Sequence, residues 1–224
     1  MAVARKITQW SYSRWKCYQE CPRKAKYSFI DRMKTPESPA MARGTAIHKA
    51  AEDYITGARK TIAPELKNVK AALQLLRKGG ASAEGELAFT INWQPVGWFD
   101  PSVWVRVKVD ATMPTYGKVR ELLVIDWKSG RKYPDHEQQL SLYGLAGLVI
   151  NPLVDTARCQ DHYTDIAKDN VLEHVYKRTE LPALQKDWAK QTKAMLSDTK
   201  FAPLPSYSCP RCPFSKANGG PCEF

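Results

Sequence analysis

The sequence predicts an α/β domain in which a mixed central β-sheet is flanked by helices. From Val103 to Asp110 polar and apolar residues alternate, which is typical of a half-buried strand. The run LLVIDWK, Leu122 to Lys128, is apolar on both faces and is typical of a central strand. At 224 residues, with no internal repeat or low-complexity linker, the chain is expected to form one domain over residues 1–224.

Capping and turn residues delimit the expected elements. Ser11 or Ser13 is a possible N-cap, Pro64 suits a first helical turn, and Gly79 with Gly80 suits a helix end. Pro36 and Pro39 indicate a loop, and Pro114 to Gly117 indicates a turn between two strands. We therefore expect, in order, helices over 11–30, 43–56 and 65–78, strands over 83–93, 103–110 and 122–128, a helix over 135–149, strands over 156–165 and 171–177, and a helix over 181–196. Asp161, Asp165 and Asp169 are expected to be solvated turn residues, and Cys159 a small core residue.

The charge balance favours a polyanionic partner. Lys and Arg number 34 against 23 Asp and Glu, which leaves a formal charge of +11. The alternative is a protein that is merely basic and soluble. No stretch approaches the roughly 20 apolar residues of a membrane span, and MAVARKITQW lacks the apolar core of a signal peptide. We therefore expect a cytoplasmic protein, without a membrane partner, in which grouped cysteines indicate metal or redox chemistry.

Two carboxylates and a lysine end the predicted strand pair. If the strands pair as a hairpin, Asp110 lies beside Asp126 and Lys128. Carboxylates held together repel unless a cation lies between them, and hard oxygen ligands select Mg²⁺ or Mn²⁺. Such an ion can polarise a phosphoryl oxygen, while Lys128 orients water or offsets negative charge, so the pattern predicts phosphodiester hydrolysis. The alternative is an ordinary ion pair at a strand end.

A cysteine cluster lies in the C-terminal tail. Cys209 and Cys212 form a C-x2-C pair, and Cys222 follows after nine intervening residues. Three thiolates require a soft cation, either zinc or an iron-sulfur cluster, and a fourth ligand from elsewhere. Cys17 and Cys21, four residues apart on one face of the first predicted helix, are the candidates. A tail of free thiols without metal is the alternative.

Five stretches in order, followed by these cysteines, resemble the PD-(D/E)XK nuclease superfamily. Within it the chain is similar to the RecB-like branch, which includes the AddB and RecB nuclease domains and the CRISPR-associated adaptation nucleases. The stretches are SYSRWKCYQECPRKAKY, RGTAIHKAAEDY, ELAF, VDA followed by IDWKSG, and QQLSLYG. The resemblance spans nearly the whole chain and implies a restriction-endonuclease-like core.

The resemblance also implies roles for individual residues. It makes His48, Asp110, Asp126 and the Trp127 carbonyl the ligands of Mg²⁺ or Mn²⁺, and Lys128 the residue that assists the attacking water. Glu86 matches an acidic position, and Gln139 with Tyr143 matches the QxxxY motif that flanks the metal and contacts DNA. Without the resemblance, His48 would be a structural histidine, Glu86 an exposed strand residue and the Gln139–Tyr143 pair a surface feature. For the cysteines it implies a [4Fe-4S] cluster, with zinc as the alternative, held by Cys21, Cys209, Cys212 and Cys222, which would join the helix over 11–30 to the tail over 207–224.

These inferences lead to one expected function and two alternatives. We expect a Mg²⁺- or Mn²⁺-dependent exonuclease that acts on DNA with a single-stranded segment or a free end. Its size and the lack of a G-x-x-x-x-G-K-[ST] motif suggest a role in recombination, replication or repair, in a phage-encoded protein of the host cytoplasm. The alternatives are a non-catalytic DNA-binding protein and a zinc-stabilised adaptor, both of which keep the nuclease fold.

Overall fold

A computed structural model describes residues 5–224, which form two compact units. The first unit comprises the chain up to Glu37 together with Ala189–Phe224. The second unit is Ser38–Trp188. The expectation of a single domain over 1–224 stays a prediction.

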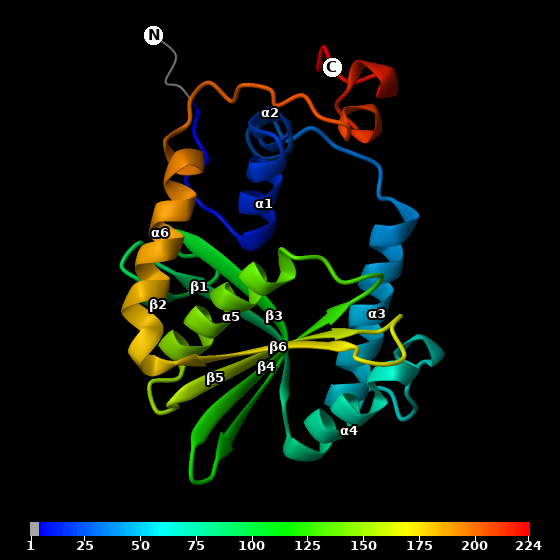
Figure 1. The fold of residues 1–224 in the computed structure, drawn as a ribbon, viewed down its shortest axis with the longest axis vertical. Helices are drawn as coiled ribbons and strands as arrows, with labels where there is room; N and C mark the ends of the chain where they lie inside the picture. The colour runs from blue at the N-terminus through cyan, green and yellow to red at the C-terminus, as the bar shows by residue number, and fades with distance from the viewer. Residues whose placement is uncertain (1–4) are drawn as a thin grey trace. The chain divides into compact units, whose positions relative to one another are not determined.

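A six-stranded sheet forms the centre of the second unit (Figure 1). Its strand order is β2-β1-β3-β4-β5-β6. The β4–β5 pair is parallel and the other four pairs are antiparallel, so the sheet is mixed, as the sequence predicts. The strands are β1 (Ser82–Phe89), β2 (Pro95–Val96), β3 (Val105–Tyr116), β4 (Arg120–Lys128), β5 (Thr156–Tyr163) and β6 (Val171–Lys177).

Helices pack on both faces of this sheet. Leu123, Ile125 and Trp127 of β4 contribute to one core with residues of α3 (Pro39–Thr56), η2 (Pro64–Val69) and α4 (Lys70–Gly79). On the other face, α5 (His136–Ile150) packs closely, since a Cβ at its Gly147 would lie 2.8 Å from Leu122. The predicted α/β sheet flanked by helices is therefore confirmed, and β4 is central, as its apolar faces predict.

Several boundaries differ from those expected from the sequence. Strand β1 ends at Phe89 instead of residue 93, and the helix expected over 65–78 is the 3₁₀ helix η2 followed by α4. β3 continues through Asp110 to Tyr116, and the bend that follows it covers residues 117–119. Pro114 therefore lies within β3, level with Leu122, rather than opening a turn. Helix α3 starts at Pro39, four residues before the expected start, because Ser38 caps it by accepting a hydrogen bond from Met41 N.

The first unit begins with an interrupted helix instead of the continuous one expected over 11–30. Helix α1 (Tyr12–Glu20) ends at Cys21, which is extended with φ −167° and ψ 116°. The chain then continues as α2 (Pro22–Ala25) and the π-helix η1 (Lys26–Ile30). Proline disfavours helical geometry in the residue that precedes it, so Pro22 explains the break.

The rest of the first unit comes from the C-terminal part of the chain. Helix α6 (Leu181–Ser197) contributes its last residues, and two short 3₁₀ helices, η4 (Cys209–Arg211) and η5 (Lys216–Asn218), follow. The buried aromatic residues of this unit include Trp10, Phe201 and Phe214. Among residues 5–224, no helix combines the length and apolar character needed to cross a bilayer.

Candidate functional site

His48, Glu84 and Asp110 form a compact group in the second unit. One ligand atom from each lies within 4.8 Å of the other two, and in residues 5–224 this is the one group of three or more such side chains. His48 is on α3, Glu84 on β1 and Asp110 on β3. His48 Nδ1 lies 2.9 Å from Asp110 Oδ1 in a hydrogen bond. An imidazole nitrogen and two carboxylates suit a divalent ion such as Mg²⁺ or Mn²⁺, so the donor set fits the metal implied by the sequence.

Asp110 also connects this group to β4. Continuing the β3–β4 register, in which Ala111 pairs with Ile125, by one residue brings Asp110 level with Asp126. Asp110 Oδ2 accepts a hydrogen bond of 2.7 Å from the Trp127 backbone N–H. Burial, together with the nearby Asp126 charge, raises the pKa of Asp110. A bound cation would offset this repulsion between the two carboxylates.

Four other expected site residues form a closed ring of polar contacts. Lys128 Nζ lies 2.5 Å from Asp126 Oδ2 and donates to Gln139 Oε1 at 2.7 Å. Gln139 Nε2 donates to the Tyr143 hydroxyl at 2.5 Å, and that hydroxyl donates to Asp126 Oδ1 at 2.6 Å. The DxK strand end and the QxxxY helix face therefore meet, as expected from the resemblance. Both Asp126 oxygens are directed to the ring, and the three-residue metal group contains Glu84 in place of Asp126.

The ring fixes the protonation states of its members. Burial opposes charge on Asp126, but Lys128 outweighs it and holds the pKa of Asp126 below its ordinary value. Burial likewise disfavours the Lys128 ammonium, while Asp126 and Asp161 raise its pKa on balance. The pKa of Tyr143 is well above 10 because the side chain is buried beside Asp126. At neutral pH the ring therefore contains a carboxylate, an ammonium and a neutral phenol.

The packing of α5 against the sheet positions Gln139 and Tyr143. Gly144 follows Tyr143, and a Cβ built on it would overlap the ring of Tyr176 on β6. Only a residue without a side chain permits this approach of helix to sheet. The close contact holds Tyr143, which is 4 % exposed, against Asp126.

The acidic residue expected at Glu86 is not in the metal group. Glu86 is exposed on β1 level with Lys108, and Glu84 contributes the carboxylate to the group. Glu84 has a positive φ of 55°, and Lys108 Nζ lies 2.5 Å from Glu84 Oε2. Strand alternation places both glutamates on one face, but the left-handed backbone at Glu84 breaks that alternation. The sequence offered two acidic candidates and no signal for the distortion that separates them.

Asp161 is not the solvated turn residue expected from the sequence. It lies on β5 level with Asp126 and has no exposed surface. Within the described residues neither carboxylate oxygen has a hydrogen-bond partner, and the nearest basic nitrogens are Lys128 Nζ at 4.0 Å and His136 Nδ1 at 3.9 Å. Burial raises the pKa of Asp161 to about 8, and Lys128 opposes part of that rise. Its alternation with buried Ala157 and Cys159 was the signal that could have identified it as an inward-facing residue.

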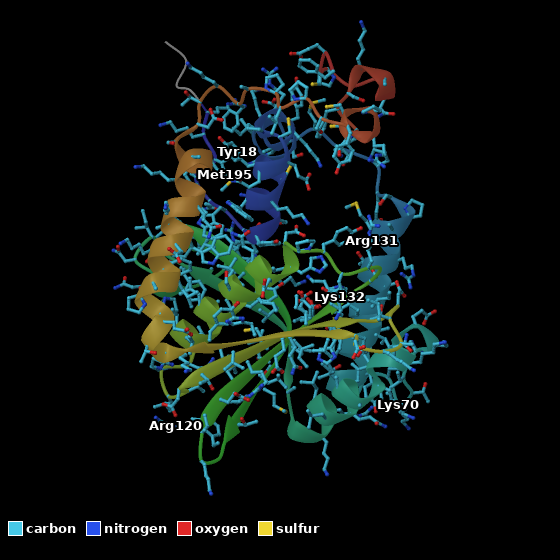
Figure 2. The ribbon with its side chains drawn as sticks, in the orientation of Figure 1. Tyr18, Lys70, Arg120, Arg131, Lys132 and Met195 are labelled. Carbon is cyan, nitrogen blue, oxygen red and sulfur yellow. The ribbon has the colours of Figure 1, made fainter. Side chains whose placement is uncertain are left out.

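The loop after β4 presents positive charge near the end of that strand. Arg131 and Lys132, labelled in Figure 2, lie in this loop. The Arg131 guanidinium lies over Tyr133, and Lys132 Nζ lies over Tyr163. Asp165 accepts hydrogen bonds from Arg43 and from Gly130 N, so it fixes the turn rather than being freely solvated. These cations follow Lys128 directly in sequence and suit a phosphate-bearing ligand.

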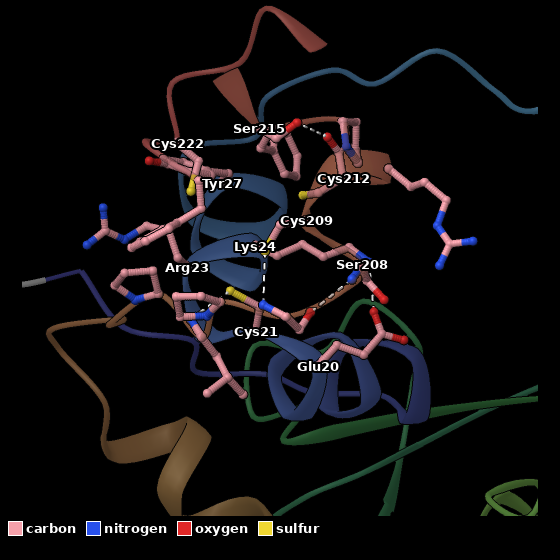
Figure 3. Close-up of a pocket in the computed structure, with 18 of the residues that line it drawn as sticks. Glu20, Cys21, Arg23, Lys24, Tyr27, Ser208, Cys209, Cys212, Ser215 and Cys222 are labelled. Atoms are coloured by element: carbon pink, nitrogen blue, oxygen red, sulfur yellow. Dashed lines mark hydrogen bonds and ion pairs between the residues drawn. The ribbon is translucent and has the colours of Figure 1, made fainter. Parts of the chain in front are cut away.

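A separate site lies within the first unit, where four cysteines line one cavity of about 490 Å³ (Figure 3). They are Cys21, Cys209, Cys212 and Cys222. Backbone N–H groups of Leu204 and Ser206 donate to the sulfur atoms of Cys21 and Cys209, at 3.4 and 3.2 Å. The four residues expected as ligands are therefore brought to the same cavity.

Cys17 is not among the residues that line this cavity. Since Cys21 interrupts the first helix, the two cysteines do not share one continuous helical face. Burial raises the pKa of the Cys17 thiol to about 11, so this thiol is protonated at neutral pH. Cys21 rather than Cys17 is thus the cysteine that structure places with the tail.

The long interval between Cys212 and Cys222 is closed by a glycine turn. Gly219 has φ 74°, and a Cβ on Gly220 would overlap the backbone of Phe214. The chain consequently returns so that Cys222 N donates to Phe214 O at 2.9 Å and pairs with Ser215. The nine intervening residues form a compact loop and do not prevent Cys222 from reaching the cavity.

The spacing of the sulfur atoms bears on the kind of metal. A tetrahedral zinc ion with bonds of about 2.3 Å holds its thiolates about 3.8 Å apart. In residues 5–224 no three cysteine sulfurs meet the 4.8 Å limit that the His48 group meets. The cysteines are therefore brought to one cavity without the close sulfur spacing that a bound zinc ion would impose.

Comparison with a family model agrees with this architecture. The family model for the PD-(D/E)XK nuclease superfamily matches residues 9–217. The crystal structure of SSO0001 is 15% identical, covers 95% of this chain and 86% of its own, and gives a TM-score of 0.44. A protein from Eubacterium rectale, provisionally named an exonuclease, is 10% identical, with coverage of 92% and 87% and a TM-score of 0.48. No curated protein matches the sequence.

Proposed function

The chain belongs to the PD-(D/E)XK nuclease superfamily, and we propose that it is a Mg²⁺- or Mn²⁺-dependent exonuclease that hydrolyses DNA. The observation that carries this proposal is the meeting of two groups at the end of β4. The His48–Glu84–Asp110 group offers ligands for a divalent ion, and the Asp126–Lys128–Gln139–Tyr143 ring lies beside it, joined through Trp127 N and Asp110.

The proposed ligands are His48, Glu84 and Asp110, with Asp126 and the Trp127 carbonyl completing the set expected from the sequence. When bound, a divalent ion would polarise the scissile phosphate and lower the pKa of a water molecule. His48 binds as the neutral imidazole, although in the ion-free protein the pKa of His48 is raised, because the hydrogen bond to Asp110 and the charges of Asp110 and Asp126 together outweigh burial. We expect metal binding and protonation of His48 to compete.

Lys128 acts as a protonated group rather than as a base. Its pKa is raised, and its Nζ contacts Asp126 and Gln139 at once, so the ammonium has a fixed position. A fixed cation can orient the attacking water and stabilise negative charge that develops on the phosphoryl oxygens. Gln139 and Tyr143 position Lys128 and Asp126, and Glu86 remains an outlying acidic residue on β1.

The finer features of the proposal come from the whole chain. The net charge of +11 and the cations Arg131 and Lys132 favour a nucleic-acid substrate. The resemblance of the quoted stretches to the RecB-like branch fits digestion of DNA from a free end or a single-stranded segment. We place this activity in recombination, replication or repair in the cytoplasm, and in the host cytoplasm if a phage encodes the protein.

For the first unit we propose a [4Fe-4S] cluster bound by Cys21, Cys209, Cys212 and Cys222. The four cysteines line one cavity, and backbone N–H groups donate to two of their sulfur atoms. The resemblance of the quoted stretches favours a cluster over zinc. Its role is structural, because it joins the break after α1 to the C-terminal tail. Broad absorbance near roughly 400 nm with stoichiometric iron supports the cluster, whereas colourless protein with one zinc ion per chain after anaerobic purification contradicts it.

A time course on end-labelled oligonucleotides tests the nuclease activity. Single- and double-stranded substrates labelled at either end are incubated with and without Mn²⁺, and the products are separated by length. We expect metal-dependent shortening from an end, and roughly a 100- to 1,000-fold loss of rate in Lys128→Met with DNA binding retained. Lys118→Met, an exposed lysine in the bend between β3 and β4, is the matched control and should cleave normally.

The same experiment separates the proposal from its rivals. A wild-type protein that binds DNA but leaves every substrate intact in Mn²⁺ would be a non-catalytic member of the fold. Metal-dependent cleavage that persists in Lys128→Met would refute the assigned site. Internal cuts in a circular substrate would replace the exonuclease with an endonuclease.

A further inference from the structure

A second cavity in the first unit is lined by an excess of positive charge. It has a volume of about 860 Å³, and the segments that enclose it are residues 5–9, Arg14 and residues 28–32. Its charged lining residues are Arg5, Lys6, Arg14, Arg32 and Asp31. The single carboxylate, Asp31, lies 2.6 Å from Lys26 Nζ, so it is already paired outside the set. The lining therefore carries four basic side chains and one carboxylate, and that carboxylate is paired with Lys26.

The chain holds these cations in defined positions. Ile7 is 4 % exposed and fixes the segment that carries Arg5 and Lys6. Arg14 Nη1 donates to Gln9 O at 2.9 Å, and its guanidinium lies over the ring of Phe29 at 5.3 Å. These contacts leave Arg14 oriented rather than freely rotating, which lowers the entropic cost of binding a ligand.

Arg32 is held by an uncommon backbone conformation. Its φ is 53°, a left-handed value that a non-glycine residue adopts at a cost of about 1 kcal/mol or more. The conformation follows directly after the π-helix η1, and Met33 N donates to Tyr27 O at 2.9 Å to complete the turn. Arg32 itself is exposed and has no ion pair among the described residues. The strained turn thus presents an unpaired guanidinium at the cavity.

From these observations we propose that the Arg5–Lys6–Arg14–Arg32 cavity binds phosphate groups of a DNA strand, through residues other than those of the metal group. Guanidinium groups match phosphate oxygens in pairs, and the cavity is large enough for more than one phosphate. Thr8, Gln9 and Ser28 supply neutral polar groups to the same lining. The proposal rests on the DNA substrate proposed above and adds a binding site that carries no chemistry.

Charge reversal tests this site. Lys6→Glu and Arg32→Glu each remove one cation from the lining, and Lys118→Glu makes the same change of charge at an exposed position in the bend between β3 and β4. Binding of a fluorescent 20-nucleotide strand is measured by anisotropy without divalent ions, at several salt concentrations. We expect each cavity variant to weaken binding roughly 10-fold and to reduce the salt slope by about one, while Lys118→Glu changes affinity less than about 2-fold. Thermal melting confirms that the variants fold.

Binding of strands with a 5′-phosphate or a 5′-hydroxyl identifies which phosphate the cavity holds. If the loss of affinity is confined to strands with a 5′-phosphate, the cavity binds a terminal phosphate; if it is equal with a 5′-hydroxyl, it binds internal phosphates. Equal weakening by Lys118→Glu and the cavity variants would overturn the proposal, since it would leave only a general effect of net charge. The result of the binding assay does not depend on catalysis. Absence of cleavage in Mn²⁺ contradicts the nuclease proposal, whereas the binding assay still tests whether the cavity binds DNA.

Discussion

The two candidate metal sites are built in opposite ways. The residues around Asp110 and Asp126 lie on strands and long helices, and backbone or side-chain partners hold them. The cysteine cavity is built from a helix break and two 3₁₀ turns, η4 and η5, with two N–H to sulfur hydrogen bonds. The first site is therefore assembled by the fold itself, whereas we propose that the second needs a bound metal to fix its ligands.

The sizes of the two units agree with this difference. The sheet unit has an extensive apolar core, which includes Leu66, Leu73 and Ile125. The cysteine-bearing unit has only about 70 described residues, taken from both ends of the chain. Units of roughly this size seldom gain more than about 3–5 kcal/mol from their core, and many are stabilised by a metal. Loss of the metal should therefore affect the two units very differently.

The largest effect is expected from Cys212→Ser. Removing one thiolate should abolish cluster binding and the melting transition of the first unit, because metal binding supplies much of the folding energy of such a site. Cys17→Ser is the matched control, since Cys17 lies on the preceding helix and outside the cavity. Limited proteolysis of the tail measures the result. If Cys212→Ser and Cys17→Ser are cleaved at the same rate, the proposed staple between helix and tail is wrong.

The second-largest effect is expected on metal binding by the His48–Glu84–Asp110 group, where variants of Glu84 and Glu86 distinguish the two glutamates. Glu84→Gln removes a carboxylate from the metal group, and we expect the Mn²⁺ concentration for half-maximal cleavage to rise roughly 10- to 100-fold. Glu86→Gln changes an exposed residue on the same strand and should alter the Mn²⁺ concentration for half-maximal cleavage less than about 2-fold. A metal titration of cleavage rate measures both variants. The reverse order would restore the assignment made from sequence.

Most of the fold and much of the site could be predicted from the sequence. The strand pair could be predicted from the alternation of residues 103–110 and from the apolar run before Asp126. Pairing these strands as a hairpin then predicts that Asp110 and Asp126 lie level, as the register has them. The QxxxY spacing predicts that Gln139 and Tyr143 share one helical face, and in the structure they are hydrogen-bonded to each other and Gln139 accepts from Lys128. These features depend on local periodicity, which a sequence displays directly.

The features that were not predicted depend mostly on single backbone angles or on long-range pairing. The break at Cys21 follows from Pro22 and was available as a signal, but helical composition on both sides masked it. The positive φ of Glu84 has no local sequence mark. The burial of Asp161 arises from the parallel pairing of β5 with β4, which links residues 35 positions apart.

A smaller effect is expected inside the ring. Tyr143→Phe removes the hydroxyl that donates to Asp126 and accepts from Gln139, and leaves the packing of the aromatic ring unchanged. One buried hydrogen bond to a charged group contributes about 1.5–3 kcal/mol, so cleavage should slow roughly 10- to 100-fold if all of it acts in the transition state, and less otherwise. Single-turnover rates at saturating Mn²⁺ measure the change. An unchanged rate would show that the ring is structural and does not position Asp126 for catalysis.

The smallest expected effect is on the pH dependence of stability and comes from Asp161. Its folded-state pKa is about 8 against an ordinary value of 3.8, so between these pH values the folded protein retains a proton that the unfolded chain releases. Stability from this group is therefore complete below about pH 4 and is lost as pH rises to about 8. Asp161→Asn lacks the titration, and its melting temperature relative to wild type should increase by a few degrees from pH 7 to pH 9, since the one pH unit between 7 and about 8 corresponds to about 1.4 kcal/mol, and 1 kcal/mol to about 2–4 °C in a domain of this size. Melting curves in a buffer without divalent ions measure this difference, because other groups titrate alike in both proteins. If the difference in melting temperature between Asp161→Asn and wild type is constant across that range, Asp161 is ionised in the folded state and stabilised by Lys128 at 4.0 Å. The sheet unit would then tolerate three buried carboxylate charges, those of Asp110, Asp126 and Asp161, before any metal binds.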